Sequence, residues 1–309
     1  PSSAKLHHNL GVIWQELGNI ELALICFKKA WQIDSHYENN IIKISLLLGG
    51  YKFNKNLISD KQSKELFLFL FKRNDINHNH IFHNAIKIIS FEKNLDEIRS
   101  LINTNTSILI NPIIQKLLRE ELFNLILQKS IVVDKIFEQL LTKIRKEILI
   151  AINNINLKKL NKSFDFIVSL AEQCFLNEYV FNQSEKETKN IYLLKNTLLK
   201  NNEINELKLA ILGCYMPLST NKIIANRLLK YKSKNPLFND LITLQIKNPL
   251  KENELAKSIK SFGKITDTVS QKVKKQYEKH PYPRWRYTYK NSPLSFLNIL
   301  NNKIKLKKI

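Results

Sequence analysis

Apolar residues recur along most of this chain at intervals of three and four positions, which is the spacing of one face of an α-helix. Asp134, for example, should open a helix whose apolar positions from Ile136 to Ile148 fall on a single face. No convincing run alternates apolar and polar residues in the way that predicts a β-strand. The pattern therefore predicts an all-α protein built from successive amphipathic helices.

Short polar residues and prolines mark where several of these helices should begin. Asn111-Pro112, Asn235-Pro236 and Asn248-Pro249 each offer an asparagine N-cap followed by a proline at the first helical position. Ser163 is the expected cap of a further helix. We expect residues 59–265 to form a helical bundle domain, an irregular set of antiparallel helices joined by short loops.

The first part of the chain contains one unit, Ala4–Tyr37, whose length and pattern resemble a tetratricopeptide repeat, a helix pair that stacks on its neighbours. Gly11 should let the two helices approach closely, and Gly18 should make the turn between them. The residues expected to fill the seam are Leu10, Trp14, Phe27 and Ala30. The match fades one period later, and one repeat cannot bury its apolar face alone. Residues 1–58 are therefore interpreted as the end of a repeat array that begins upstream.

The chain has 309 residues, a formal net charge of +22 and a pI near 9.7. A basic nucleic-acid-binding helical protein is one reading, since clustered cations release counterions from phosphates. The lysines, however, are spread along the whole chain among many asparagines and isoleucines, as an AT-rich coding sequence would give. Diffuse charge gives solubility rather than a specific partner, so nucleic acid is the less favoured partner.

The cysteines and the hydropathy indicate a reducing compartment away from membranes. Cys26, Cys174 and Cys214 are far apart, odd in number and set in apolar helical patterns, without metal or redox spacing. This usage predicts a cytoplasmic location. No apolar run reaches the roughly 18 residues that a membrane span requires, so we expect no membrane partner.

Few residues are candidates for catalytic chemistry. His78, His80 and His83 are close in sequence, but only His80 and His83 share a helical face, and no nearby cysteine or carboxylate completes a metal site. Polar residues at a helix start are the favoured reading. The six glycines form no phosphate-binding loop, and no hydrolase or nucleotide-binding motif occurs. We therefore assign no catalytic, cofactor-binding or metal-binding residue to this chain.

The stretch Leu170–Phe181 is polar in an unusual way for a helix with an apolar stripe. Gln173 and Asn177 form an amide pair one helical turn apart, and Glu178 follows. The favoured interpretation is a polar network that ties helices together. A face that contacts a ligand is the alternative.

The stretch Lys274–Lys290 interrupts the helical pattern near the end of the chain. A helix that includes Tyr277 should end just before two prolines, which force an extended segment. Such a segment presents Tyr282, Arg284 and Trp285 at a low cost of ordering. It is read as a rigid linker packed on the bundle, as a rim or lid over a neighbouring site or domain junction, or as a nucleic-acid stacking surface.

The residues QYEKHPYPRW (Gln276–Trp285) resemble the segment that precedes the catalytic domain in bacterial tetratricopeptide-repeat class I S-adenosylmethionine-dependent methyltransferases. Four other stretches are similar to that family: LLREELFNLIL (Leu117–Leu127), FEQLLTKIRKEIL (Phe137–Leu149), SLAEQCFLNEYVF (Ser169–Phe181) and NPLFNDLI (Asn235–Ile242). The resemblance implies repeats, then this helical region, then a Rossmann-like domain with a glycine-rich loop. Residues 266–309 would be a helix and a PYPRW linker leading into that domain.

The resemblance implies a fragment that lacks the residues of the methyl-donor site, so S-adenosylmethionine is expected only for the full-length protein. The chain itself would recognise or position a substrate. Its expected partners are a protein or peptide in the repeat groove and its own C-terminal catalytic domain. Two alternatives remain open: a repeat-type interaction scaffold without enzymatic activity, and the basic nucleic-acid-binding protein described above.

Overall fold

The computed structural model describes residues 3–92, 95–154, 162–201, 203–260, 263, 265–279 and 286–287. These ranges consist of helices and the turns that connect them, without a β-strand, which confirms the predicted all-α class. The first helices are α1 (Ala4–Glu16), α2 (Ile20–Ile33), α3 (Glu38–Gly50), α4 (Lys55–Ile58), α5 (Lys61–Lys72), α6 (His78–Glu92), α7 (Leu95–Ile102), α8 (Pro112–Leu118) and α9 (Glu121–Lys129).

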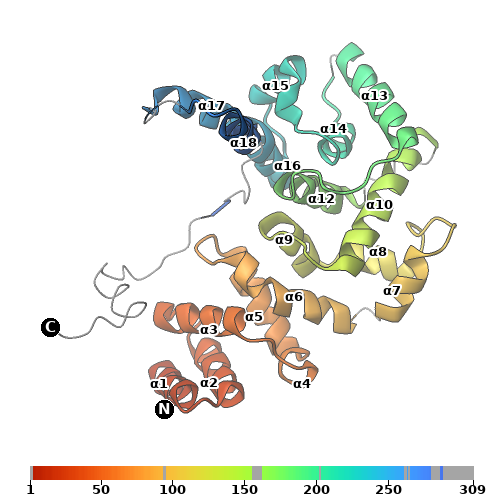
Figure 1. Cartoon of the computed structure of the whole chain (residues 1–309). Helices are drawn as coiled ribbons and strands as arrows, with labels where there is room; N and C mark the ends of the chain where they lie inside the picture. The colour runs from red at the N-terminus through yellow and green to blue at the C-terminus, as the bar shows by residue number, and fades with distance from the viewer. Residues whose placement is uncertain are drawn as a thin grey trace.

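The second series of helices starts with the longest one and completes an arc that follows the order of the chain (Figure 1). Its members are α10 (Lys135–Asn154), α12 (Phe164–Leu176), α13 (Glu185–Lys200), α14 (Glu206–Gly213), the 3₁₀ turn η1 (Leu218–Thr220), α15 (Lys222–Leu229), α16 (Pro236–Ile242), the π-helical segment η2 (Thr243–Lys247), α17 (Asn248–Ser258) and α18 (Thr268–Lys279).

Helices α1 and α2 pack as a pair, and both glycines take the predicted places. Gly18 lies in the connecting turn at φ +79°, a left-handed conformation that favours glycine. A Cβ atom on Gly11 would lie 2.7 Å from the Phe27 ring, so the two helices come this close only because position 11 has no side chain. That this pair is a tetratricopeptide repeat stays a prediction.

The expectation that Leu10 fills the seam of this pair is wrong, because 40% of its surface is exposed. The buried residues of α1 are Ala4, His8 and Gly11, which share one side of the helix. Since each residue turns the helix by about 100°, Leu10 is directed away from that side. Trp14 is partly buried against the core, as expected.

Most of the predicted helix starts are confirmed. The side chains of Asn111, Asp134 and Asn235 each accept hydrogen bonds from two backbone N–H groups in the first turn of the following helix. Helix α12 begins directly after Ser163, although the side chain of that residue makes no capping bond. Helix α18 reaches Lys279, immediately before the predicted proline segment.

Helix α17 begins at Asn248 with Pro249 in its first turn, as predicted, but the predicted N-cap role of Asn248 is wrong. Helix α16 continues through η2 directly into α17, and both Lys247 and Asn248 have right-handed helical backbone angles. Pro249 lacks the N–H group that would bond the carbonyl one turn earlier. A π-helical turn is a common way for a helix to absorb such a break in its hydrogen-bond ladder, so the proline lies inside a continuous helical segment.

Helix α12 lies at the centre of the arc, against α9, α14 and α16 (Figure 1). Every residue from Phe166 to Leu176 is buried. One hydrophobic cluster runs from Ala23 to Ile246 and includes Ile58, at the expected end of the repeat region. The domain boundaries after residues 58 and 265 stay predictions.

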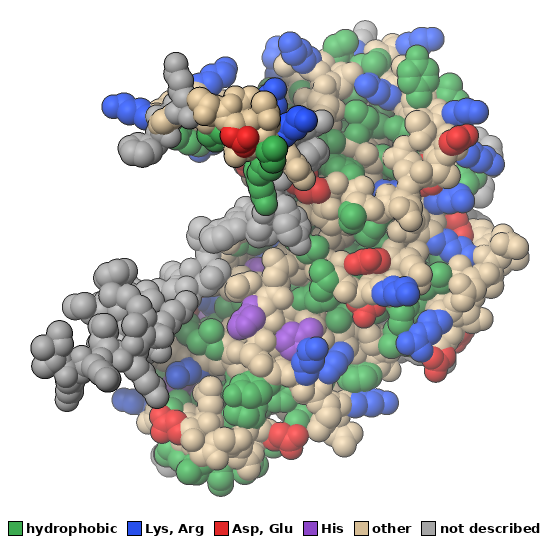
Figure 2. Space-filling model, viewed as in Figure 1, with side chains coloured by type: hydrophobic (Ala, Val, Ile, Leu, Met, Phe, Trp, Pro, Cys, Tyr) green, Lys and Arg blue, Asp and Glu red, His purple; other side chains and the backbone are tan. Residues whose placement is uncertain are grey.

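Basic side chains are scattered over the face of the molecule seen in Figure 2, with acidic and neutral polar side chains between them. In the described ranges, several basic side chains are paired with carboxylates, such as Lys28 with Asp60 at 2.6 Å and Lys72 with Glu121 at 2.7 Å. None of the helices in the described ranges combines the length and the apolar character needed to cross a bilayer.

Candidate functional site

The buried helix α12 carries a carboxylate, Glu172, whose residue surface is only 1% exposed. A charged group removed from water is stable only when a counter-ion or several hydrogen bonds replace its hydration. The neighbouring polar position on this face, Ser169, accepts a hydrogen bond from the Gln128 amide of α9 at 2.8 Å. The interface between α9 and α12 therefore contains a polar strip inside an otherwise apolar core.

Arg286 supplies the counter-ion for Glu172. Its Nη1 and Nη2 atoms donate to Glu172 Oε2 at 2.7 Å and to Oε1 at 3.1 Å, a two-point pairing of guanidinium and carboxylate. Nη1 also donates to the backbone carbonyl of Gln128. Burial raises the pKa of Glu172, and the positive charge of Arg286 opposes that rise. Burial acts against the charge of Arg286 as well, but the carboxylate holds its pKa above the usual value.

The ends of two helices add negative partial charge to this site. Gln128 and Lys129 are the last residues of α9, where unpaired carbonyl groups attract cations. Lys129 Nζ in turn donates to the carbonyl of Arg73 at 3.0 Å and to Asn74 Oδ1 at 2.8 Å, directly after the end of α5. Both cations are therefore held by carbonyl groups at or just after helix C-termini, and Arg286 is held by Glu172 as well.

Tyr287 packs over the two cations and against His78. Lys129 Nζ lies 4.9 Å from the centre of the Tyr287 ring, and the guanidinium carbon of Arg286 lies 5.4 Å from it. The His78 ring meets the Tyr287 ring edge-on at 5.7 Å. Cations over an aromatic face are attracted by its negative quadrupole, so residues 286–287 are held by charge and by ring packing together.

Burial and the neighbouring charges change the protonation of this site. Burial, followed by the charge of Lys129, lowers the pKa of His78 to about 4. His78 is therefore neutral near pH 7, and its Nε2 donates to the Arg73 carbonyl at 3.0 Å. Burial, followed by the charge of Arg286, lowers the pKa of Lys129 to about 8. Since each of these groups is engaged by carbonyls or a counter-ion, the arrangement suits holding a chain segment rather than transferring a proton.

Of the predicted polar residues, Gln173 lies in α12 next to Glu172, whereas Asn177 and Glu178 follow the end of this helix. Gln173 is fully buried beside Glu172, and neither of its amide atoms has a hydrogen-bond partner among the described residues. Asn177 ends the helix, and its Oδ1 accepts from the backbone N–H of Tyr179 at 3.1 Å. Glu178 and Tyr179 follow at φ +56° and +58°, a left-handed turn that directs the chain away from α12. The backbone N–H of Asn177 donates to the Gln173 carbonyl at 3.0 Å, but no hydrogen bond joins the two side chains, which are both in the described part of the chain.

The residues predicted near the C-terminus fall largely outside the part of the chain that the structure describes. Tyr282, Arg284 and Trp285 lie in the range that is not described. Tyr277 is in α18, with 65% of its surface exposed. The described residues that follow the proline segment are Arg286 and Tyr287, and these two make the contacts with the bundle.

Sequence reasoning missed Glu172, Arg286, Tyr287 and Lys129 as members of one site. The available signal was Glu172 itself, a carboxylate next to Ala171 in a helix with an apolar stripe. A charge that is buried requires a partner. The sequence could not identify that partner, since 114 residues separate Glu172 from Arg286.

The histidines and cysteines make separate contacts. His83 Nε2 donates to the Tyr51 carbonyl at 3.0 Å, and His80 lies against Gly49 on α3. Across the described ranges, no three side chains of His, Cys, Asp or Glu come together as a metal site. All three cysteines are buried and free, and burial raises the pKa of Cys26 and Cys214.

Compared with protein-family models, curated proteins and solved structures, the chain gives no match. The family resemblance of the sequence therefore stays a prediction.

Proposed function

We propose that this chain is the substrate-recognition and positioning region of an S-adenosylmethionine-dependent methyltransferase of the class that its sequence resembles. In this role the helices bind a protein or peptide substrate. Residues 286–287 fix the path of the chain between the helical bundle and a catalytic domain.

The observation that carries this proposal is the buried pair of Glu172 and Arg286. Glu172 belongs to the segment Ser169–Phe181, and Arg286 follows directly on Gln276–Trp285; these are the two segments with the most specific family resemblance. The pair joins them with two hydrogen bonds of 2.7 and 3.1 Å. A contact between these segments is expected if both serve one junction.

The physical advantage of such a junction is a defined geometry. A guanidinium paired at two points with a buried carboxylate accepts few alternative orientations. The Tyr287 ring adds contacts with α6 through His78 and with α9 through Lys129. A domain that begins after this anchor would start from a fixed position relative to the bundle.

The proposal is tested first with the gene. The codons after Ile309 should encode a β-strand followed by a glycine-rich loop, and a stop codon there would refute the proposal. The product of the extended gene should bind labelled S-adenosylmethionine in equilibrium dialysis, whereas residues 1–309 alone should show no saturable binding. Saturable binding to residues 1–309 would place the donor site within this chain and would contradict the assignment.

The role of the junction is tested in the extended product by Glu172→Gln. We expect slower methyl transfer with an unchanged affinity for the methyl donor, because the substitution weakens positioning and leaves the donor site intact. Asp96→Asn is the matched control, since Asp96 pairs with Arg99 on the surface of α7. Equal transfer rates for Glu172→Gln and the unaltered product would refute the positioning role.

A repeat-type interaction scaffold without enzymatic activity is the second candidate, and the surface of α1 favours it. Leu6, Leu10, Ile13 and Leu17 recur on one side of this helix and are 40–70% exposed. An apolar stripe of this spacing suits packing against another helix. An extended gene product that neither binds the methyl donor nor transfers methyl groups would favour this candidate.

A further inference from the structure

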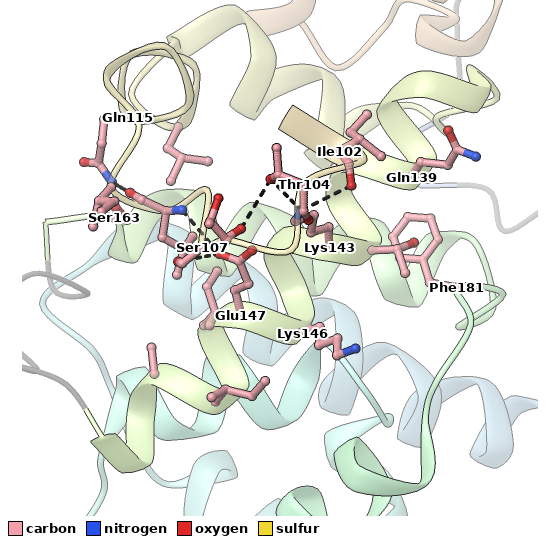
Figure 3. A pocket seen from close by; sticks show the side chains of 18 of the residues that line it. Ile102, Thr104, Ser107, Gln115, Gln139, Lys143, Lys146, Glu147, Ser163 and Phe181 are labelled. Atoms are coloured by element: carbon pink, nitrogen blue, oxygen red, sulfur yellow. Dashed lines mark hydrogen bonds between the residues drawn. The ribbon is translucent and has the colours of Figure 1, made fainter. Parts of the chain in front are cut away.

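A cavity of about 1060 Å³ lies between α10, the loop that joins α7 to α8, and the segment that follows α12. Figure 3 shows this cavity, with side chains from the loop and from α10 directed toward one another. It is distinct from the Glu172 site, since none of Glu172, Lys129, Arg286 or Tyr287 lines it. Its size is at the upper end of the range of sites for small molecules.

Two opposite charges on neighbouring turns of α10 hold one wall of the cavity. Lys143 Nζ donates to the carbonyls of Leu101 at 3.0 Å and Ile102 at 3.2 Å, at the end of α7. Glu147 accepts from Ser107 Oγ at 2.7 Å and from the Ile108 backbone N–H at 2.9 Å. The dashed lines in Figure 3 show the bonds of Lys143 and Glu147 to those loop residues that line the cavity. The wall is therefore formed before a ligand arrives, which reduces the ordering cost of binding.

Apolar side chains line the interior and the edge of the cavity. Leu118 and Phe181 are buried in its lining. Ile110 and Val180 also line it, and 75% and 70% of their surfaces are exposed. An apolar group that covers these exposed side chains would remove their apolar surface from water, which lowers the free energy of the complex.

The charges around the cavity favour an anion. Arg119, Lys143, Lys146 and Lys162 line it, against the carboxylates of Glu138 and Glu147. Lys143 and Glu147 are both bonded to the loop, as described above. Lys146 and Lys162 have no carboxylate partner within the described ranges, and Arg119 makes only a long hydrogen bond of 3.4 Å to Gln115. Glu138 offsets one of these three cations, so a positive excess remains.

We infer that this cavity binds a small amphiphilic anion, a molecule with an apolar body and a carboxylate or phosphate group. The apolar body lies against Leu118, Phe181, Ile110 and Val180. The anionic group lies among Arg119, Lys146 and Lys162, which have no carboxylate partner in the described part of the chain. This inference goes beyond the proposed methyltransferase role and does not depend on it.

The test uses four probes with one decyl chain and different head groups, each below its critical micelle concentration. Decanoate and decyl phosphate are anionic, decyl maltoside is neutral, and decyltrimethylammonium is cationic. Binding is followed by NMR of the chain labelled with ¹³C at isoleucine and valine methyl groups, which locates the site. We expect saturable shifts at Ile110 and Val180 with the anions, and the tighter of the two anions identifies the preferred head group.

The variant Arg119→Gln/Lys146→Gln/Lys162→Gln removes the three cations. Its matched control, Lys222→Gln/Lys230→Gln/Lys251→Gln, removes three exposed charges that do not line the cavity. Both have the same net charge, so they separate a local site from general attraction to a basic protein. We expect about tenfold weaker anion binding in the first variant, as three exposed ion pairs allow, and unchanged binding in the control.

A second variant, Val180→Asp, places a charge on the exposed apolar edge, where 70% of the native surface already contacts solvent. It should weaken binding of the anionic probes, and it should leave the unfolding midpoint unchanged. Three results would overturn the inference. These are equally weakened anion binding in the triple variant and in its triple control, binding of decyl maltoside as tight as that of the anions, and methyl shifts confined to other parts of the chain. Failure of every probe to bind would overturn it as well.

Discussion

Replacing Arg286 with methionine tests whether the pair with Glu172 stabilises the fold. The side chains of Arg286 and Glu172 are 12% and 2% exposed. Removing one partner of a buried ion pair costs roughly 3–5 kcal/mol, because the remaining charge is left without compensation. Glu172 can escape part of this cost by taking up a proton. We therefore expect a loss near the lower end, about 3 kcal/mol, at pH 7.5.

The pH dependence of this loss follows from the pKa of Glu172. Burial already raises that pKa, and removing the opposing charge of Arg286 raises it further. A carboxyl group whose pKa is higher in the folded state stabilises the fold below its unfolded pKa, and this contribution is lost as the pH rises. The Arg286→Met variant should thus be closer in stability to the unaltered chain at pH 5 than at pH 7.5.

The assay is urea unfolding followed by circular dichroism at both pH values. Arg99→Met is the control, since the Arg99–Asp96 pair is 56% and 87% exposed and should contribute no more than about 1 kcal/mol. In a Glu172→Gln background, Arg286→Met should cost much less, because no buried charge remains. A loss below about 0.5 kcal/mol at both pH values, or the same loss in the Glu172→Gln background, would refute the reasoning.

Three further predictions concern His78, the α1–α2 pair and the loop after α7. Because the pKa of His78 in the folded chain is about 4, the unfolded chain binds more protons than the folded chain between pH 4 and 6.5. Acidification through this window should therefore remove up to about 3 kcal/mol of stability. The variant His78→Gln should flatten this part of the curve when the free energy of urea unfolding is measured against pH. Gly11→Ala should cost about 1–3 kcal/mol through its clash with the Phe27 ring, whereas Gly50→Ala, which meets no atom within 4 Å, should leave the thermal midpoint unchanged or raise it. Glu147→Gln should cost about 1 kcal/mol in urea unfolding by weakening the bonds to the loop after α7, and unchanged stability would contradict that role.

Local sequence patterns were sufficient to predict the fold class and most helix starts. Asn111, Asp134 and Asn235 cap their helices because a short polar side chain can satisfy nearby N–H groups without help from the rest of the fold. The same reasoning failed for the cap role of Asn248, because the chain is already helical through η2 when it reaches this residue. Local chemistry therefore predicts a helix start only when the surrounding structure does not extend the helix before it.

The candidate site was predictable only in part, because its members come from distant parts of the chain. The helix with Gln173 and Asn177 was recognised as unusually polar, and the segment around Trp285 as unusually rigid. Their relation was not, since Arg286 and Glu172 meet only after the intervening helices have packed. The burial of Leu10 was predicted wrongly for a related reason. The repeat pattern does not determine how α1 is rotated about its own axis.

The long separation between Glu172 and Arg286 also has a consequence for synthesis on the ribosome. The carboxylate emerges 114 residues ahead of its counter-ion, and chains begin to fold from the N-terminal side while they are being made. During that interval the nascent bundle must either keep Glu172 hydrated or hold it as the neutral acid. The ion pair of Glu172 and Arg286 at the interface between α9 and α12 can therefore form only after Arg286 has left the exit tunnel.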